Sequence, residues 1–142
     1  MAQRKLRLHW RKNFGLDRSD GRLRFREKLT TLPDGFASGN SNARIEMTPN
    51  GRFIYVANRG HDSLAGFAVD QRSGRLSSLG QTKTEPTPRG FAVDPSGRCL
   101  LAAGEASGKL TLFQIDETTG KLSRRATHDV GSRPWWVLMT HH

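Results

Sequence analysis

Apolar residues recur along this chain in short runs that turn residues interrupt, a pattern typical of β-strands. In the C-terminal half, the apolar run Gly90–Val93 is followed by Asp94-Pro95-Ser96-Gly97, a turn with Pro at its second position and Gly at its fourth. Three more runs follow, at Arg98–Gly104, Leu110–Asp116 and Lys121–Val130. Because short loops separate these runs, the pattern predicts four antiparallel strands connected by tight turns.

This four-strand pattern occurs twice, in Ile45–Arg89 and again in Gly90–Trp135. Pro49 matches Pro95 and Phe67 matches Phe113, with the same offset of 46 residues and no gap. A fixed period of about 40–50 residues is the signature of repeat architectures, among them the β-propellers, whose blades have four antiparallel strands. A β-sandwich would also have evenly spaced strands, but it does not by default contain a gapless repeat. The repeat therefore favours an all-β fold built from propeller blades.

The N-terminal segment repeats only the second half of a blade. Phe14-Gly15-Leu16-Asp17 resembles Phe67-Ala68-Val69-Asp70 at an offset of 53, and the seven extra residues fall in Leu32–Ala43. We therefore divide the chain into a basic arm with two strands of a partial blade (1–31), a connecting loop (32–44), two blades (45–89 and 90–134) and the first strand of a further blade (135–142, with its apolar run at Trp135–Met139).

Two blades and two partial blades do not close a ring, because propellers typically have 4–8 blades. Open strand edges and exposed apolar faces would remain at both ends. We therefore expect the isolated chain to self-associate or to be only marginally folded.

Composition adds looser limits. The chain has 142 residues, of which 35% are hydrophobic, and no stretch approaches the 18 apolar residues of a membrane helix. Its first residues lack the apolar run of a signal peptide, so we expect a cytoplasmic protein without a membrane partner. The single cysteine, Cys99, excludes a disulfide framework and lies in a predicted strand, where we expect a buried, inert thiol.

The formal net charge of +10 is unevenly distributed. Met1–Lys28 holds ten basic and three acidic residues, a net charge of +7. With Trp10 and Phe14, such an arm could bind nucleic-acid phosphates. A solvated terminus explains the same charge, and we favour it, so no nucleic-acid partner is expected.

Two runs resemble a known family: TPNGRFIYVANRGHDSLAGFAVD, from Thr48, and TPRGFAVDPSGRCLLAA, from Thr87. Both are similar to the C-terminal part of the lactonase family of seven-bladed β-propellers, which includes 6-phosphogluconolactonases and shares its fold with carboxymuconate cyclases. The resemblance covers roughly Asn13–Pro134. It implies a β-propeller fragment with about two full blades and two partial ones, corresponding to the last two-fifths of a family member.

The alternating direction of the strands places one set of loops at one end of the blades. The loop between the second and third strands lies there together with the loop that joins one blade to the next. The polar and charged residues expected at this end are Asn40, Asn42, Arg59, His61, Asp62, Arg89, Glu105 and Arg133. The turns DPSG and DQRSG lie at the opposite end, where their Asp, Ser and Gly residues suit turn geometry.

Lactone hydrolysis requires a base for water and donors for the oxyanion, and a phosphorylated sugar requires cationic partners. The resemblance carries over to Arg59, His61 and Asp62 in NRGHDS and to Arg89 in PRGF. It implies that Arg59 and His61 are catalytic and that Arg89 and Asp62 bind substrate. No cofactor or metal is expected.

These residues also have structural interpretations. Asp62 could cap its own turn or pair with Arg59, His61 could be a hydrogen-bonding residue between blades, and Arg89 could tie adjacent blades together. We expect Asn40 and Asn42 to be exposed in a polar loop.

The sequence departs from the family pattern at two places. Arg44 stands where an acidic residue is frequent, and Gly104-Glu105-Ala106 stands where an Asn-containing turn is common. We expect a 6-phosphogluconolactonase-like hydrolase of carbohydrate metabolism, in the pentose phosphate pathway, acting on a sugar lactone. The alternative is a non-catalytic propeller fragment or binding module.

Overall fold

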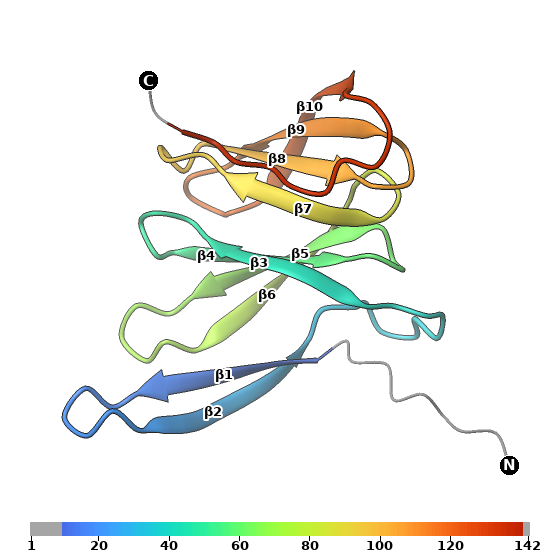
Figure 1. Ribbon diagram of the computed structural model, residues 1–142. Coiled ribbons are helices and arrows are strands. Elements are labelled where there is room, and N and C mark those ends of the chain that lie inside the picture. Colours follow the sequence, from blue (N-terminus) through green and yellow to red (C-terminus); the bar gives the residue numbers. More distant parts are fainter. Residues whose placement is uncertain (1–9, 141–142) are drawn as a thin grey trace, which may run out of the picture.

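The computed structural model describes residues 10–140, which fold entirely into β-strands and the turns between them (Figure 1). No helix in this part of the chain is long and apolar enough to cross a membrane. The strands are β1 (Trp10–Leu16), β2 (Leu23–Thr30), β3 (Asn42–Met47), β4 (Phe53–Asn58), β5 (Ser63–Val69), β6 (Leu76–Lys83), β7 (Pro88–Val93), β8 (Cys99–Gly104), β9 (Lys109–Ile115) and β10 (Leu122–Asp129).

These strands form three antiparallel sheets that follow one another along the chain (Figure 1). β1 and β2 make a hairpin, β3–β6 make the first four-stranded sheet, and β7–β10 make the second. In both larger sheets, neighbours in sequence are neighbours in space, as in a propeller blade. The expected all-β blade architecture is confirmed, and the sheets begin slightly before the predicted blade starts, at Asn42 and Pro88. We call β3–β6 blade 1 and β7–β10 blade 2.

The 46-residue repeat extends to individual backbone hydrogen bonds. At one end of the blades, the amide of Arg59 donates to the Ser41 carbonyl, and the amide of Glu105, 46 residues later, donates to the Thr87 carbonyl, both at 3.0 Å. At the other end, the turns at Asp70 and Asp116 are each closed by a bond from the glycine four residues on, at 2.7 Å. The two blades are therefore the same backbone built twice.

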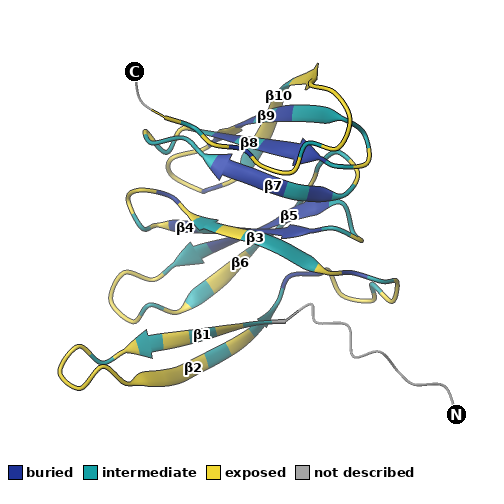
Figure 2. Cartoon of the chain, in the orientation of Figure 1, coloured by how far each residue is buried: buried dark blue, intermediate teal, exposed yellow. Residues whose placement is uncertain are grey.

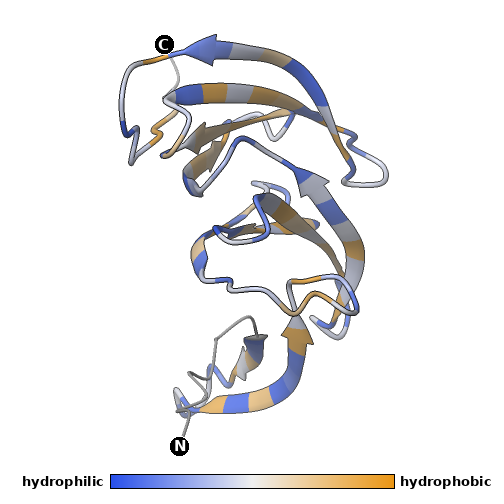
Figure 3. Cartoon of the chain, turned by 90° about the vertical axis from the view of Figure 1, so that its right-hand side faces the viewer, coloured by the Kyte–Doolittle hydropathy of each residue, from blue (hydrophilic) through white to orange (hydrophobic). Residues whose placement is uncertain are grey.

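The main core lies between the two blades. Phe53, Tyr55 and Leu64 of blade 1 pack against Phe91 and Phe113 of blade 2, and these side chains are at most 4% exposed. Figure 2 shows the buried residues concentrated on β4, β5, β7, β8 and β9, and Figure 3 shows apolar positions along the strands of the molecule. Blade 1 packs against the hairpin and blade 2, and blade 2 packs against blade 1 and the C-terminal segment. The central strands of each blade are therefore apolar on both faces.

The N-terminal hairpin covers the other face of blade 1. Its Leu29 packs against Val56, Ala65 and Phe67. Its far side remains open, since four large apolar side chains there are between 45% and 66% exposed: Phe14, Leu16, Leu23 and Phe25. This is one of the apolar faces that the sequence predicted for an incomplete ring. The predicted arm before residue 10 lies outside the described residues.

The C-terminal segment differs from the prediction. We expected a strand at Trp135–Met139, but residues 131–140 contain no strand. Val137 is nevertheless buried against Ala92 and Ala103 of blade 2, the position that an adjoining strand would take. The side chain docks because its apolar partners are present, whereas no strand of the described chain is available to complete a ladder with it.

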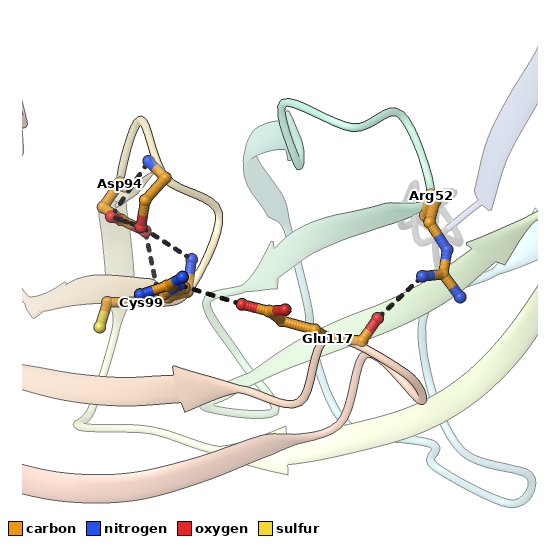
Figure 4. A network of polar contacts seen from close by, with 6 residues as sticks. Arg52, Asp94, Cys99 and Glu117 are labelled. Atoms are coloured by element: carbon orange, nitrogen blue, oxygen red, sulfur yellow. Dashed lines mark hydrogen bonds and ion pairs between the residues drawn. The ribbon is translucent and has the colours of Figure 1, made fainter.

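At the end where β3–β4, β7–β8 and β9–β10 turn, polar side chains close the turns (Figure 4). Asp94 Oδ1 accepts the Cys99 amide at 2.7 Å, and Arg52 of blade 1 donates to the Glu117 carbonyl of blade 2 at 3.0 Å. Cys99 is half-buried, and burial together with the Asp94 carboxylate raises the pKa of its thiol. We call this the turn end, and the contacts there are those of structural turns.

Candidate functional site

At the opposite end, which we call the loop end, the blades form a pocket of about 570 Å³ lined by two indoles and three guanidinium groups. β3 contributes Arg44, the β4–β5 loop contributes Arg59, and β7 contributes Arg89. Trp135 and Trp136 of the C-terminal segment complete it. The structure thus brings together two of the four predicted site residues, Arg59 and Arg89.

Two of the three arginines are already paired. Arg89 Nη1 lies 3.3 Å from Glu105 Oε2 and its guanidinium stacks 4.2 Å from the Trp135 ring centroid. Trp135 Nε1 donates to the other Glu105 oxygen at 3.2 Å, so the carboxylate holds both partners in place. This pairing lies within blade 2 and its C-terminal extension, and so Arg89 does not tie blade 1 to blade 2.

Arg44, on β3 of blade 1, is held in a similar way. It forms an ion pair with Glu46 and stacks 4.1 Å from the Trp136 ring centroid. The second Glu46 oxygen accepts the Val93 amide at 2.8 Å, which anchors the pair to β7. Stacking on an indole and pairing with a carboxylate hold a guanidinium rigidly at a pocket wall.

Arg59 is the least satisfied of the three. It makes no ion pair with any residue of the described chain, and its Nε is buried without a hydrogen-bond partner there. The expected alternative, a pairing with Asp62, is not formed. A buried guanidinium nitrogen without an acceptor is costly, and an anionic or carbonyl oxygen in the pocket would satisfy it.

His61 lies at the loop end but does not line the arginine pocket. Its ring stands edge-on to Phe36 with centroids 4.8 Å apart, and its Nδ1 lies 2.8 Å from Ser63 Oγ. The Lys83 ammonium donates to its carbonyl at 2.8 Å. Burial and the nearby Lys83 charge lower the pKa of His61, against the smaller opposing effect of Asp62.

Asp62 has a structural position. Its backbone is left-handed, with φ of 52°, and its carbonyl accepts the Thr84 amide at 2.9 Å. Its Oδ1 accepts the Thr87 amide, also at 2.9 Å. The carboxylate therefore fixes the segment that joins blade 1 to blade 2, and it does not face the pocket that Arg59 and Arg89 share.

The prediction that Asn40 and Asn42 are exposed is wrong. Asn40 is 8% exposed and Asn42 is half-buried, and both donate to Asn58 Oδ1, at 3.1 and 2.7 Å. Asn58 at the end of β4 is itself fully buried. Asn40 turns inward because backbone amides need acceptors: its Oδ1 takes those of Gly60 and His61, at 2.9 and 3.2 Å.

Sequence reasoning also missed Asn58 and Ser63 themselves, although both belong to the NRGHDS run. Ser63 is fully buried at the start of β5, and its hydroxyl accepts from Asn58 Nδ2 at 3.2 Å. A polar residue at each end of a tight loop between two apolar strands was the available signal. The paired register of Asn58 and Ser63 across β4 and β5 makes the contact.

The other predicted residues at this end, Glu105 and Arg133, line a second pocket of about 620 Å³ beside blade 2. It also contains Ser107, Asp129 and Ser132. Arg133 has a left-handed backbone, φ 53°, which matches Thr87, φ 56°, one period earlier. In the described residues, no three His, Cys, Asp or Glu side chains are grouped so that they could hold a metal ion.

The sequence of this chain is similar to those of known 6-phosphogluconolactonases. The chain is 37% identical over 124 residues to a 6-phosphogluconolactonase of Pectobacterium carotovorum, an alignment that covers 87% of this chain and 37% of that protein. It is 43% identical over 75 residues to the 6-phosphogluconolactonase of Bacillus subtilis, covering 52% of this chain and 22% of the relative. The chain therefore spans well under half the length of these relatives.

Solved structures show the same relationship. A protein of Lactobacillus plantarum superposes with a TM-score of 0.85 at 29% identity, covering 90% of this chain and 38% of that one. The periplasmic gluconolactonase of Pseudomonas aeruginosa gives 0.80 at 32% identity, covering 88% and 35%. The family model for the lactonase, seven-bladed β-propeller, matches residues 12–139, and the chain therefore belongs to that family.

Proposed function

We propose that this chain supplies part of a sugar-lactone site, and that the reaction is the hydrolytic opening of a phosphorylated aldonolactone of the 6-phosphogluconolactone kind. The observation that carries the proposal is the arginine pocket in a member of the lactonase family, with Arg59 lacking a carboxylate partner among the described residues. Because the chain spans 37% of its Pectobacterium relative, the complete activity is proposed for the complete propeller.

The chemistry of lactone opening fits the pocket. Water attacks the carbonyl carbon, the carbonyl oxygen becomes an oxyanion, and the ring ester oxygen leaves with a proton. Arg59 is the candidate for the oxyanion, since its guanidinium is not neutralised by a described carboxylate and its Nε requires an acceptor. Arg89, stacked and oriented by Trp135 and Glu105, is the candidate for the phosphate.

The test is a lactonase assay on Arg59→Ala and Arg89→Ala, with Arg98→Ala as the matched control. Arg98 is an exposed arginine of the turn end that also pairs with a glutamate, Glu117, at 3.1 Å. Removal of an oxyanion donor typically costs about 10²–10³ in kcat, so Arg59→Ala should act on kcat. Arg89→Ala should raise KM for the phosphorylated lactone more than for its unphosphorylated counterpart. Equal losses in all three variants would refute the proposed site.

A second candidate function is anion binding without catalysis. It is favoured by the absence of any carboxylate or imidazole from the described pocket lining, so that no described group there is placed to accept the proton of water. Calorimetry with 6-phosphogluconate separates the two. Binding that depends on Arg59 and Arg89, without lactone turnover by the complete propeller, supports the binding module.

The open apolar face of the hairpin supports a further proposal, that the isolated chain self-associates. Phe14, Leu16, Leu23 and Phe25 are all at least 45% exposed on that face. Sedimentation at micromolar concentration should show association, and a cooperative, stable monomer would refute it. A cytoplasmic location stays a prediction, to be tested by cell fractionation, since the related gluconolactonase of P. aeruginosa is described as periplasmic.

A further inference from the structure

The side chains around His61 are arranged so that each hydrogen-bond donor and acceptor has a defined direction. The chain of contacts begins at the backbone, where donors and acceptors are not interchangeable. The amides of Gly60 and His61 both donate to one side-chain atom of Asn40, at 2.9 and 3.2 Å, so that atom is the oxygen. Asn40 therefore presents its nitrogen to Asn58.

The orientation of Asn58 is fixed from two sides. Its Oδ1 receives the Asn40 nitrogen at 3.1 Å and the Thr31 hydroxyl at 2.7 Å. Its Nδ2 faces the backbone carbonyl of Thr31 at 2.8 Å, an atom that can only accept. The second hydrogen on Nδ2 then points to Ser63 Oγ at 3.2 Å.

Ser63 connects Asn58 to the imidazole of His61 through two hydrogen bonds. Its hydroxyl accepts from Asn58, and the described residues offer the single Ser63 proton no acceptor other than His61 Nδ1, 2.8 Å away. Because Ser63 and Asn58 are both fully buried, water does not compete for these bonds. An imidazole that accepts at Nδ1 carries its one proton at Nε2.

We propose that Asn58 and Ser63 are positioning residues that fix neutral His61 as the Nε2–H tautomer, so that His61 acts at the loop end as a hydrogen-bond donor and not as a general base. This inference deepens the proposed function and rests on it for the chemical role alone. His61 lies outside the lining of the arginine pocket, so this assignment removes it as the base for water there, and the ring would stay neutral throughout.

Protonation of the ring would work against this arrangement. A cationic imidazole must donate from Nδ1, which would turn the Ser63 hydroxyl away from it and leave the hydroxyl proton without a described acceptor. Two charged groups lie close to the ring, the Lys83 ammonium, which opposes protonation, and the Asp62 carboxylate, which favours it. Burial of the ring and the Lys83 charge both lower the pKa of His61.

The decisive measurement is NMR of the ¹⁵N-labelled chain near neutral pH. We expect a pyridine-type Nδ1, a protonated Nε2, and a slowly exchanging Ser63 hydroxyl proton that correlates with His61 Nδ1. His128, exposed on β10, supplies an internal reference in the same spectrum. A proton bonded to Nδ1 would overturn the proposal, as would a hydroxyl that exchanges freely. These readouts do not depend on lactone turnover. The proposed tautomer can therefore be disproved while the proposed function stands, and the proposed function can be disproved while the tautomer stands.

Two variants sharpen the result. Ser63→Ala removes the donor to Nδ1, and the titration midpoint of His61 should move upward. Asn58→Asp exchanges the amide donor for an acceptor, so that Ser63 should turn to the new carboxylate and His61 should carry its proton on Nδ1. Ser96→Ala, in the β7–β8 turn where the Ser96 hydroxyl donates to the Asp94 carboxylate, is the control and should leave the His61 signals unchanged. An unchanged midpoint and tautomer in both variants would also overturn the proposal.

Discussion

Blade 1 and blade 2 have the same backbone, yet they differ in the loop between their second and third strands. In blade 1, the loop holds a fully buried asparagine, Asn58, and a network of amide side chains. In blade 2, the residue 46 positions later is Gly104 and this network has no counterpart. The two loops read Asn58-Arg59-Gly60-His61-Asp62-Ser63 and Gly104-Glu105-Ala106-Ser107-Gly108-Lys109. Since blade 2 forms its four strands without the network, the fold does not require it.

The two loops also share a backbone feature. Each must have a left-handed residue at the same place, which is Asp62 with φ 52° in blade 1 and Gly108 with φ 69° in blade 2. Both carbonyls accept an amide from the segment that leaves the blade, Thr84 at 2.9 Å and Val130 at 3.0 Å. The left-handed backbone is therefore common to both blades, whereas the asparagine network belongs to the blade 1 loop.

The largest expected effect concerns what the blades share. Phe113→Ala should destabilise the chain by about 3–5 kcal/mol, because it removes a fully buried ring from the core between the blades. Urea unfolding followed by fluorescence measures the loss. Val130→Ala is the control, since Val130 is 49% exposed after β10 and should change stability by no more than about 0.5 kcal/mol. Equal losses would mean that the blades do not unfold through a common core.

The next largest effect on stability concerns the buried asparagine network of blade 1. Asn58→Ala should cost about 1–3 kcal/mol, because the buried Asn40 amide would lose its bond to Asn58 Oδ1. The same urea experiment applies, with Asn50→Ala as the matched control. Asn50 is an exposed asparagine of the turn end, and its buried partner, the Thr48 hydroxyl, keeps the Phe53 carbonyl as an acceptor when Asn50 is removed. A smaller loss for Asn58→Ala than for Asn50→Ala would contradict the buried network.

The sequence predicted the strands and turns of the two blades better than the contacts between their side chains. Periodicity and turn residues predicted the third strand of the second blade at Leu110–Asp116, and the structure has it at Lys109–Ile115. The pattern of turns also predicted which loops share an end. These features follow from local rules, in which strand alternation and turn chemistry act over a few residues.

The site itself was only partly predictable. Arg59 and Arg89 were chosen by residue type and family resemblance and do share a pocket, but Trp135, Trp136 and Arg44 join them from segments far apart in sequence. Asn40 looked like an ordinary loop residue because nothing local shows that two backbone amides of another loop would lack acceptors without it. Such contacts depend on how the loops approach one another, which no short stretch of sequence encodes.

A smaller effect tests the left-handed position that the loops share. Asp62→Ala should destabilise the chain by about 1–2 kcal/mol, since Ala tolerates a positive φ less well than Asp and cannot accept the Thr87 amide. Asp62→Gly loses the same hydrogen bond but relieves the backbone, as the blade 2 loop does with Gly108. Thermal unfolding should therefore rank the wild type first, the glycine variant second and the alanine variant third. The reverse order of the two variants would mean that relief of the positive φ does not govern this position, since both variants lose the same carboxylate.

The smallest expected effect is the pH dependence that His61 gives to blade 1 alone, since blade 2 has Ser107 in its place. The pKa of His61 is lowered in the folded chain by burial and by Lys83. At a pH below the ordinary histidine value of about 6.5, the unfolded state therefore binds more protons than the folded state. Stability should fall slightly as the pH drops through that value towards the lower folded pKa, and it should level off below it. His61→Asn, whose amide oxygen can accept the Ser63 hydroxyl, should flatten this slope between pH 7 and pH 5 in urea titrations, whereas His128→Asn on exposed β10 should not. A slope that survives in His61→Asn would assign the proton to another group.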